Sequence, residues 1–280
     1  MDVKIRKNNY GEYIILDADN FREGIAVIAN NAIHQIQLRG SNNNKFDFSI
    51  LLPVAELIEV LSFSGFGSIC EINNLEVLYS FKKLQTLFFH EKECFSLDIS
   101  RFENLISLGT FYWNGISSLF NSNSIGKLAL SGFNDNTLRK MVSLRNLNEL
   151  HISQSRLLSL EHIEECVSLS KLTLTYNSLL INASSINETS LKELRIEKCR
   201  NLHKASYLFN NTSIEELYLD VVDSLYFVPS MKNLKKIYFL NCKDGNLQPL
   251  LESQSLEIIY FPSNRKHYTH KLQEIKELRK

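Results

Sequence analysis

Short apolar phrases recur along this chain at nearly regular intervals, and this repetition limits the possible folds more than any other feature. Each phrase has apolar residues at its first, fourth and sixth positions, as in Leu147-x-x-Leu150-x-Ile152. The central residues of the copies, which lie 20 to 26 residues apart, are Ile36, Leu61, Leu87, Leu108, Leu128, Leu150, Leu172, Leu194, Leu217, Ile237 and Ile259. A period of this length is typical of solenoids, in which each repeat is one coil stacked on its neighbours.

The spacing inside each repeat predicts two kinds of backbone. The fourth and sixth positions alternate with period two, so they predict a short strand whose apolar side chains face the core. The return segments carry apolar side chains at every third position, for example Leu157, Leu160, Ile163, Cys166 and Leu169. A period of three favours tight turns and 3₁₀ segments over full α-helices. We therefore expect an α/β solenoid with a parallel sheet, in which each coil buries its apolar side against the next.

The phrase resembles the signature of leucine-rich-repeat proteins, L-x-x-L-x-L-x-x-N/C-x-L. The asparagine-or-cysteine position holds Asn177, Cys199, Cys242 and Asn264, whereas other residue types occupy it in the remaining copies. The resemblance covers residues 33–264, and the short coils are similar to those of the bacterial internalin-like class. It implies a horseshoe of about 11 coils with a parallel concave sheet and a convex side of 3₁₀ segments and turns.

Both ends of the repeat array are expected to carry caps, because a terminal coil otherwise exposes its core and its strand edge. Residues 1–32 predict an N-terminal cap with a β-hairpin, its strands at residues 3–5 and 13–16, followed by a short helix near Phe21, Ile25 and Ile28. No linker composition interrupts the chain, so residues 1–280 are expected to form a single domain.

The C-terminal cap is expected over residues 265–280. Leu272, Ile275 and Leu278 lie at three-residue spacing among charged residues and predict an amphipathic helix. This segment carries six Lys and Arg residues against two Glu residues. Two interpretations stay open, a solvated cap or a docking handle for an acidic partner.

Charge and hydropathy exclude several classes of protein. The chain has 31 Lys and Arg residues and 31 Asp and Glu residues, and this balance argues against a general nucleic-acid binder. No stretch approaches the roughly 20 apolar residues that a membrane helix needs, and the first residues lack the apolar core of a signal peptide. We therefore expect a cytoplasmic protein without a nucleic-acid or membrane partner, whose five cysteines are reduced.

The sequence contains no motif that predicts catalysis or a cofactor. The phrases GxSxG, GxxxxGK[ST], HExxH, GxGxxG and CxxC are all absent. His267-x-x-His270 lacks a cysteine or carboxylate at ligand spacing, and Asp17-Ala18-Asp19 needs no ion to form a turn or a helix cap. We therefore expect no enzyme, no cofactor and no metal.

Two kinds of residue outside these motifs are expected in the core. Cys166, Cys199 and Cys242 fall on the inward positions of their coils and predict buried thiols. The single tryptophan, Trp113, occupies the inward asparagine position of its coil and is also predicted to be buried.

The strand residues that alternate with the inward leucines predict the binding surface. They form two columns on the concave face, and tyrosines at positions 218, 238 and 260 fall on three successive strands, so these rings should stack as an aromatic ladder. Exposed aromatics beside charged residues are typical of interface hot spots, although neighbouring tyrosines also stiffen a sheet without binding anything. The candidate partner-binding residues are His151, Thr173, Arg195, Glu197, Tyr218, Asp220, Tyr238, Leu240 and Tyr260.

A second, weaker candidate surface lies in the N-terminal half of the chain. It contains Phe88, His90, Phe111 and Tyr112. The register of the first coils stays open at this point, and a shift by one residue would exchange buried and exposed side chains.

The expected function is non-enzymatic protein binding. Leucine-rich-repeat proteins typically bind proteins, and the acidic residues beside the ladder predict Lys or Arg in the partner's contact patch. A stoichiometric binder or inhibitor fits this architecture, and an immunity-type protein that covers a toxin is one version. The alternatives are a glycan- or small-ligand-binding protein that uses the aromatic ladder, and a purely structural scaffold.

Overall fold

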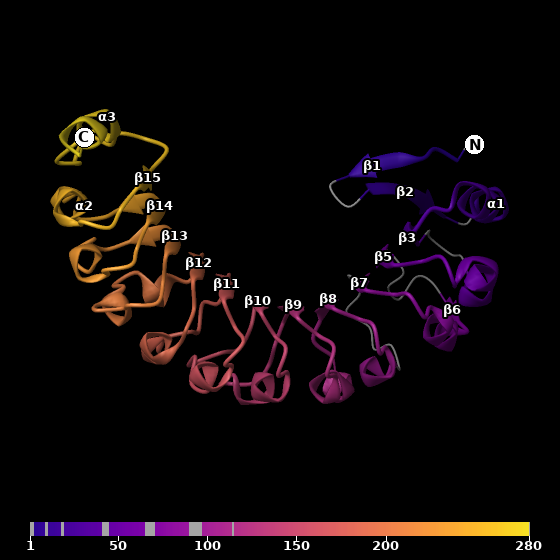
Figure 1. Cartoon of the computed structure of the whole chain (residues 1–280). Coiled ribbons are helices and arrows are strands. Elements are labelled where there is room, and N and C mark those ends of the chain that lie inside the picture. Colours follow the sequence, from indigo (N-terminus) through magenta and orange to yellow (C-terminus); the bar gives the residue numbers. More distant parts are fainter. Residues whose placement is uncertain are drawn as a thin grey trace. The chain divides into compact units, whose positions relative to one another are not determined.

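The apolar phrases of the sequence form a stack of short parallel strands, as the period-two alternation predicts. The structure is a computed structural model that describes residues 3–8, 11–17, 20–40, 45–64, 71–89, 97–113 and 115–279. The chain divides into two compact units, Met1–Ala129 and Leu130–Lys280. Within each unit the strands line one side and the short helical segments line the other (Figure 1). We call the strand-lined side the sheet face.

The first unit begins with an antiparallel hairpin and continues as parallel strands. Its strands follow the order β1-β2-β3-β5-β7-β8, with bounds β1 Arg6–Asn8, β2 Gly11–Leu16, β3 Gln35–Arg39, β5 Val60–Ser64, β7 Thr86–Phe89 and β8 Ser107–Phe111. Strand β9, Lys127–Ser131, contains the boundary between the units. A separate small sheet pairs β4, Lys45–Asp47, with β6, Glu71–Asn73. The returns are helix α1, Phe21–Asn31, and 3₁₀ segments at Phe48–Val54, Leu75–Ser80, Ile99–Arg101 and Ile116–Asn121.

The second unit is a run of parallel strands in sequence order. Its strands are β10 Glu149–Ser153, β11 Lys171–Thr175, β12 Glu193–Glu197, β13 Glu216–Val222, β14 Lys236–Cys242 and β15 Ile258–Tyr260. Helices α2, Gln248–Glu252, and α3, Leu272–Leu278, lie near its end. The other returns are 3₁₀ segments at Arg139–Ser143, Ile163–Glu165, Ser184–Glu188, Arg200–Leu202, Ser206–Leu208 and Val228–Ser230. These segments confirm that a three-residue period predicts tight returns.

The predicted register is confirmed in the second unit, and the structure settles the register of the first. In the first, Ile36 pairs with Leu61, and Leu87 pairs with both Leu61 and Leu108. In the second, the central residues of β10 to β15 pair in turn from Leu150 to Ile259. Every central residue from Ile36 to Ile259 is buried. The register of the first coils, which the sequence left open, is therefore the one with the central leucines inward.

The asparagine-or-cysteine position satisfies backbone groups inside the second unit. Asn177 is fully buried, and its Oδ1 accepts hydrogen bonds from the Ser155 N–H at 3.0 Å and the Ser155 hydroxyl at 2.6 Å. Its Nδ2 donates to the Ile152 carbonyl at 2.9 Å. Asn264 does not share this role, because the chain leaves the coil after β15; it is exposed, and its Oδ1 accepts the N–H of Leu272.

The N-terminal hairpin is confirmed, but its first strand lies later than predicted. Strand β1 is Arg6–Asn8 rather than residues 3–5, and Arg6 faces Tyr13 in the register of the pair. Gly11 faces Asn8 in this pair and has a φ of +117°, which favours glycine. The predicted short helix is α1, in which Ile28 is fully buried.

The C-terminal helix is also confirmed, with one difference on its apolar side. Ile275 is fully buried, whereas Leu278 is 66% exposed. The place against the last coil is taken by the next residue, Arg279, whose guanidinium donates to the carbonyls of Leu250, Ser253 and Leu256. These carbonyls have no further coil to bond to, so an arginine serves this end better than a leucine.

None of the helices among the described residues is long and apolar enough to cross a membrane.

Candidate functional site

Tyr218, Tyr238 and Tyr260 lie side by side on the sheet face of the second unit. Strands β13, β14 and β15 pair in parallel with Tyr218 facing Tyr238 and Tyr238 facing Tyr260. The rings of the first pair stack with centroids 6.4 Å apart, and those of the second pair are tilted at 6.2 Å. The predicted stacking is confirmed. Tyr218 and Tyr238 are half-buried, and Tyr260 is 49% exposed.

Arg195 extends this stack by one strand. It faces Tyr218 across the β12–β13 pair, and its Cζ lies over the tyrosine ring, 4.1 Å from the centroid. Arg195 also forms an ion pair with Glu197 on its own strand. We call Arg195, Tyr218, Tyr238 and Tyr260 the aromatic stack; it joins one cation and three aromatic rings in a single row on the sheet face.

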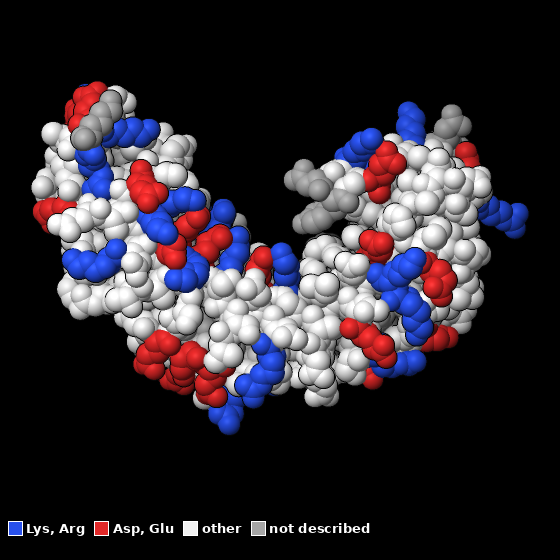
Figure 2. All heavy atoms as spheres, viewed as in Figure 1, with Lys and Arg blue, Asp and Glu red and all other residues white. Residues whose placement is uncertain are grey.

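A ladder of ion pairs lies beside the aromatic stack, at the starts of the strands. Lys171 pairs with Glu193 at 2.8 Å, and Lys236 pairs with Glu216 at 2.6 Å. Glu215 bonds to Lys192 at 3.0 Å and to Lys235 at 2.6 Å, and these two hydrogen-bonded cations lower its pKa, Lys235 most strongly. Figure 2 shows positive and negative side chains interspersed over this part of the second unit. The acidic residues beside the tyrosines are therefore already paired within the chain.

Three grooves follow one another from the ion-pair ladder, past the aromatic stack, to the end of α3. The charged groove, about 340 Å³, lies among the side chains of the ion-pair ladder and is lined by Glu193 and Glu216. The tyrosine groove, about 330 Å³, shares those two glutamates and adds Arg195, Tyr218 and Tyr238. The end groove, about 570 Å³, shares Tyr238 and is closed by residues 256–260 and the end of α3. Because neighbouring grooves share lining residues, they form one path across β10 to β15.

His151 and Thr173 continue the first column toward β10. Both are half-buried and face each other across the β10–β11 pair. Burial lowers the pKa of His151, Glu197 opposes this shift, and Arg195 adds to it. The imidazole Nε2 lies 2.9 Å from the Thr175 hydroxyl, so His151 is held on the sheet by a neutral hydrogen bond.

The second column is less uniform than predicted. Leu240 is 39% exposed and Glu197 is half-buried, so both reach the sheet face. The prediction that Asp220 faces outward is wrong, because this residue is only 4% exposed. Its carboxylate accepts the Lys198 N–H at 2.7 Å and the Val221 N–H at 2.7 Å. Lys198 has a left-handed φ of 54°, so Asp220 stabilises the turn of the preceding coil instead of meeting a partner.

Four lining residues of the end groove were missed by the sequence reasoning, Glu257, Ile258, Lys276 and Arg279. The signal for Ile258 was its column: the equivalent residues on the five preceding strands are Glu149, Lys171, Glu193, Glu216 and Lys236, all charged. Ile258 breaks this charged pattern. The change is found by comparing residue types down the column, and the apolar period by itself does not reveal it.

The weaker candidate surface in the first unit is only partly described. Phe88 and Phe111 are half-buried on β7 and β8, and Tyr112 follows β8. The Phe88 ring packs against Gly109, where a Cβ would meet the ring at 2.3 Å. His90 lies outside the described residues. Trp113 is buried, as predicted.

The three thiols in the described part of the chain have raised pKa values, which oppose formation of the reactive thiolate. Cys199 and Cys242 are buried, as predicted, and burial raises their pKa values to about 11 and about 12. Cys166 is half-buried rather than buried, since its turn lies at the surface, and desolvation and then Glu164 raise its pKa to about 11. Cys70 and Cys94 lie outside the described residues.

The described residues of the two metal-like phrases are hydrogen-bonded within the chain. His267 Nε2 lies 3.1 Å from the Cys242 carbonyl, whereas His270 Nδ1 lies 2.9 Å from the Thr269 hydroxyl. The Asp17 N–H donates to Asn20 at 3.0 Å in a turn before α1, and residues 18 and 19 lie outside the described part.

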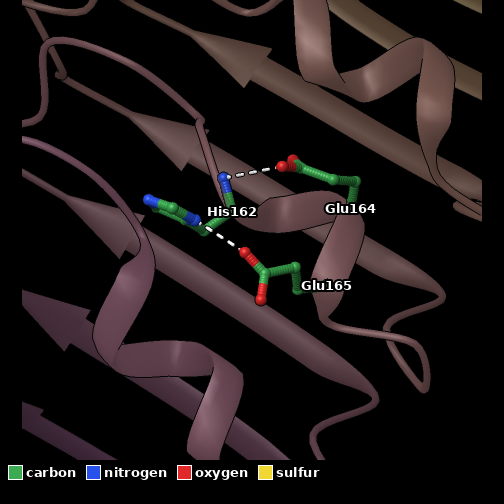
Figure 3. A group of neighbouring side chains, drawn as sticks. All are labelled: His162, Glu164 and Glu165. Atoms are coloured by element: carbon green, nitrogen blue, oxygen red, sulfur yellow. Dashed lines mark hydrogen bonds and ion pairs between the residues drawn. The ribbon is translucent and has the colours of Figure 1, made fainter.

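His162, Glu164 and Glu165 form the one group of three potential metal ligands among the described residues (Figure 3). All three come from the turn at Ile163–Glu165, which His162 enters with a left-handed φ of 74°. The His162 N–H donates to Glu164 at 3.2 Å, and its Nδ1 lies 2.7 Å from Glu165 Oε1. These bonds account for the arrangement as a closed surface turn.

The comparisons with known proteins show the fold. No protein-family model matches the chain, and no curated protein matches it. Among solved structures, an internalin (InlF) from Listeria monocytogenes is similar with a TM-score of 0.57 and 16% identity, over 86% of this chain and 71% of that one. TLR13 in its complex with ssRNA13 is similar with a TM-score of 0.54 and 15% identity, over 89% of this chain and 38% of that one. A leucine-rich-repeat protein of Leptospira interrogans gives a TM-score of 0.47 at 15% identity, over 90% and 54% of the two chains.

The repeated parallel strands, their 3₁₀ returns and the similarity to the internalin structure show that the chain has the leucine-rich-repeat fold.

Proposed function

We propose that this chain is a non-enzymatic binding protein that holds a protein partner on the sheet face of its second unit. The observation that carries the proposal is the aromatic stack, in which Arg195 and three tyrosines lie in contact across four strands. Tyrosine and arginine are the residues most enriched at interface hot spots, and here they line grooves instead of filling a core.

The contact surface would extend beyond the stack to both columns of the sheet face. We include His151, Thr173, Glu197 and Leu240, which are half-buried or exposed there. Asp220 is left out because it is buried.

The charge around the stack refines the expected chemistry of the partner. Glu193 and Glu216 each use Oε1 in an ion pair with a lysine of the same chain. A carboxylate has further acceptor sites, so a Lys or Arg of the partner can share these groups without displacing the lysines. The net charge of zero favours a partner with mixed charges over a nucleic acid.

Within this function, a stoichiometric binder or inhibitor is the form that we favour. A surface that binds by grooves and carries no catalytic motif can act by covering its partner, and an immunity-type protein that neutralises a toxin is one such case. The expected cytoplasmic location belongs to this proposal as well.

Affinity capture from the native cell tests the proposal. The bait is the full chain, compared with a Tyr218→Ala/Tyr238→Ala variant and with a Tyr176→Ala control, which removes an exposed tyrosine outside the stack. A protein retained by the wild type and the control but lost from the double variant supports the proposal. Equal retention by all three baits, with native circular dichroism of each, rejects this placement of the site.

Glycan binding is the second candidate function. The observation that favours it is the tyrosine groove, where Tyr218 and Tyr238 offer ring faces beside the carboxylates of Glu193 and Glu216. Thermal shifts across a glycan panel test it: stabilisation that disappears in Tyr218→Ala favours a glycan, and no shift with any glycan rejects this alternative.

A further inference from the structure

The end groove combines features that the rest of the sheet face lacks. It is the largest of the three grooves, at about 570 Å³, and it lies between β15 and the end of α3. Ile258 is 43% exposed on its floor, at the column position that is charged on every strand from β10 to β14. An exposed isoleucine and an exposed tyrosine, Tyr260, therefore border the same opening.

Strand β15 is the last strand of the sheet, and one of its edges is free. The Ile258 N–H donates to the Lys235 carbonyl at 3.0 Å, so Ile258 and Tyr260 direct their backbone groups toward β14. The backbone groups of Ile259 and the Glu257 carbonyl then point away from β14. Within the described residues no hydrogen bond reaches them. Free backbone N–H and C=O groups along a sheet edge can pair with one more strand.

The charge at this end also differs from that of the ion-pair ladder. Lys276 lines the end groove, and among the described residues no carboxylate forms an ion pair with it. The guanidinium of Arg279 is likewise bonded to three carbonyls and to no carboxylate of the described part. The charged groove is neutralised by its own pairs, whereas the end groove is lined by two cations, Lys276 and Arg279, and a single carboxylate, Glu257, and so keeps a net positive charge.

We propose that an extended segment of the protein partner adds as a strand to the free edge of β15, with an apolar side chain in the end groove and an aspartate or glutamate opposite Lys276. Backbone hydrogen bonds to Ile259 and Glu257 would hold the segment, and the apolar and acidic side chains would select it. This inference rests on the proposed function, because the end groove shares Tyr238 with the tyrosine groove. It also gives the basic C-terminal segment a role as a docking handle for an acidic stretch.

The test selects peptides from a random display library on the full chain. We expect the enriched peptides to share alternating apolar residues with an adjacent Asp or Glu. Ile258→Asp and Lys276→Glu should each weaken their binding at least about tenfold. Val167→Asp, at an exposed aliphatic residue outside the grooves, and Lys204→Glu, with the same change in charge at an exposed lysine of a return segment, should not weaken it.

Two further measurements separate strand addition from simple contact. The bound peptide should slow hydrogen exchange of the Ile259 amide at least about tenfold. Alternate amides of the bound peptide point toward β15 and away from it. N-methylation of the amides that point toward β15 should abolish binding. N-methylation of the amides that point away should leave binding unchanged. Protection of Ile259 requires no change in the protein, so misfolding of a variant cannot imitate it.

The outcomes separate this inference from the proposed function through Tyr218, which lines the tyrosine groove and not the end groove. Loss of binding in Tyr218→Ala but not in Ile258→Asp or Lys276→Glu overturns the inference and keeps the proposed site. Loss of binding in Ile258→Asp and Lys276→Glu, with binding retained in Tyr218→Ala, supports strand addition and rejects the aromatic stack as the binding site. An unprotected Ile259 amide, or a library without enriched peptides, overturns the inference.

Discussion

The guanidinium of Arg195 lies over the ring of Tyr218, with its Cζ 4.1 Å from the ring centroid. The two residues come from different coils but face each other across β12 and β13. This contact ties a charged residue to the aromatic stack and fixes the position of both side chains on the sheet face.

The contact predicts a measurable coupling between the two side chains. In a double-mutant cycle with Arg195→Gln and Tyr218→Leu, we expect a coupling free energy of about 0.5–1 kcal/mol, because the pair is partly exposed to water. Urea denaturation of the four proteins gives the value. Strictly additive changes in the free energy of unfolding would show that the stacking contributes nothing.

Asn177 is expected to be the most sensitive asparagine of the second unit. Asn177→Ala leaves the Ile152 carbonyl and the Ser155 N–H without their buried partner, so it should lower the free energy of unfolding by about 2–4 kcal/mol. Asn201→Ala is the matched control, since Asn201 is exposed and makes one hydrogen bond, to the Ser178 carbonyl. Chemical denaturation measures both, and equal losses for the two variants contradict a special role for the buried position.

Gly109 is expected to tolerate no side chain while Phe88 is present. A Cβ at residue 109 would meet the Phe88 ring at 2.3 Å, so Gly109→Ala should cost about 1–3 kcal/mol by displacing the ring. The double variant Phe88→Ala/Gly109→Ala should be about as stable as Phe88→Ala alone, because the obstacle is gone. Thermal unfolding of the set checks this, and a full additional loss in the double variant would point to the backbone of β8 instead.

His151 predicts a loss of stability in mild acid. Its pKa lies below the ordinary value of 6.5, first because of burial, although Glu197 opposes the shift. The unfolded chain therefore takes up a proton more readily than the folded chain, and the free energy of unfolding falls as the pH falls below 6.5 toward the folded pKa. His203, whose pKa burial also lowers, contributes with the same sign.

His151→Gln is expected to flatten this pH dependence. Glutamine retains a polar group near Thr175 but cannot be protonated in this range. Urea midpoints from about pH 7.5 to about pH 5.5 should therefore change less in the variant than in the wild type. NMR titration of the His151 ring protons gives a direct check: a midpoint at or above 6.5 contradicts the expected direction.

Periodicity predicted the aromatic stack because parallel strands in register place equivalent residues side by side. Tyr218, Tyr238 and Tyr260 follow from counting alone once the central residues are known. Asp220 does not, since counting places it outward, and its short carboxylate turns back to the Lys198 N–H of the preceding coil. Whether a polar side chain at an outward position meets solvent or a backbone donor depends on the neighbouring turn, which the repeat does not specify.

The ends of the chain show the same limit. The apolar spacing identified the C-terminal helix and its buried Ile275, but it also grouped Leu278 with the apolar side, whereas the half-buried Arg279 is the residue that bonds to the last coil. The carbonyls of the last coil decide this, because an arginine can donate hydrogen bonds to them and a leucine cannot.

The sequence by itself determined the coil, its inward leucines and the order of the strands. A repeated period of apolar residues makes each coil stack on the next, with equivalent residues side by side. The tertiary structure alone decided which charges are paired, which polar groups turn inward and where the sheet edge stays open. Those outcomes depend on atoms that meet across coils about 22 residues apart, and their distances are fixed only when the coils are stacked.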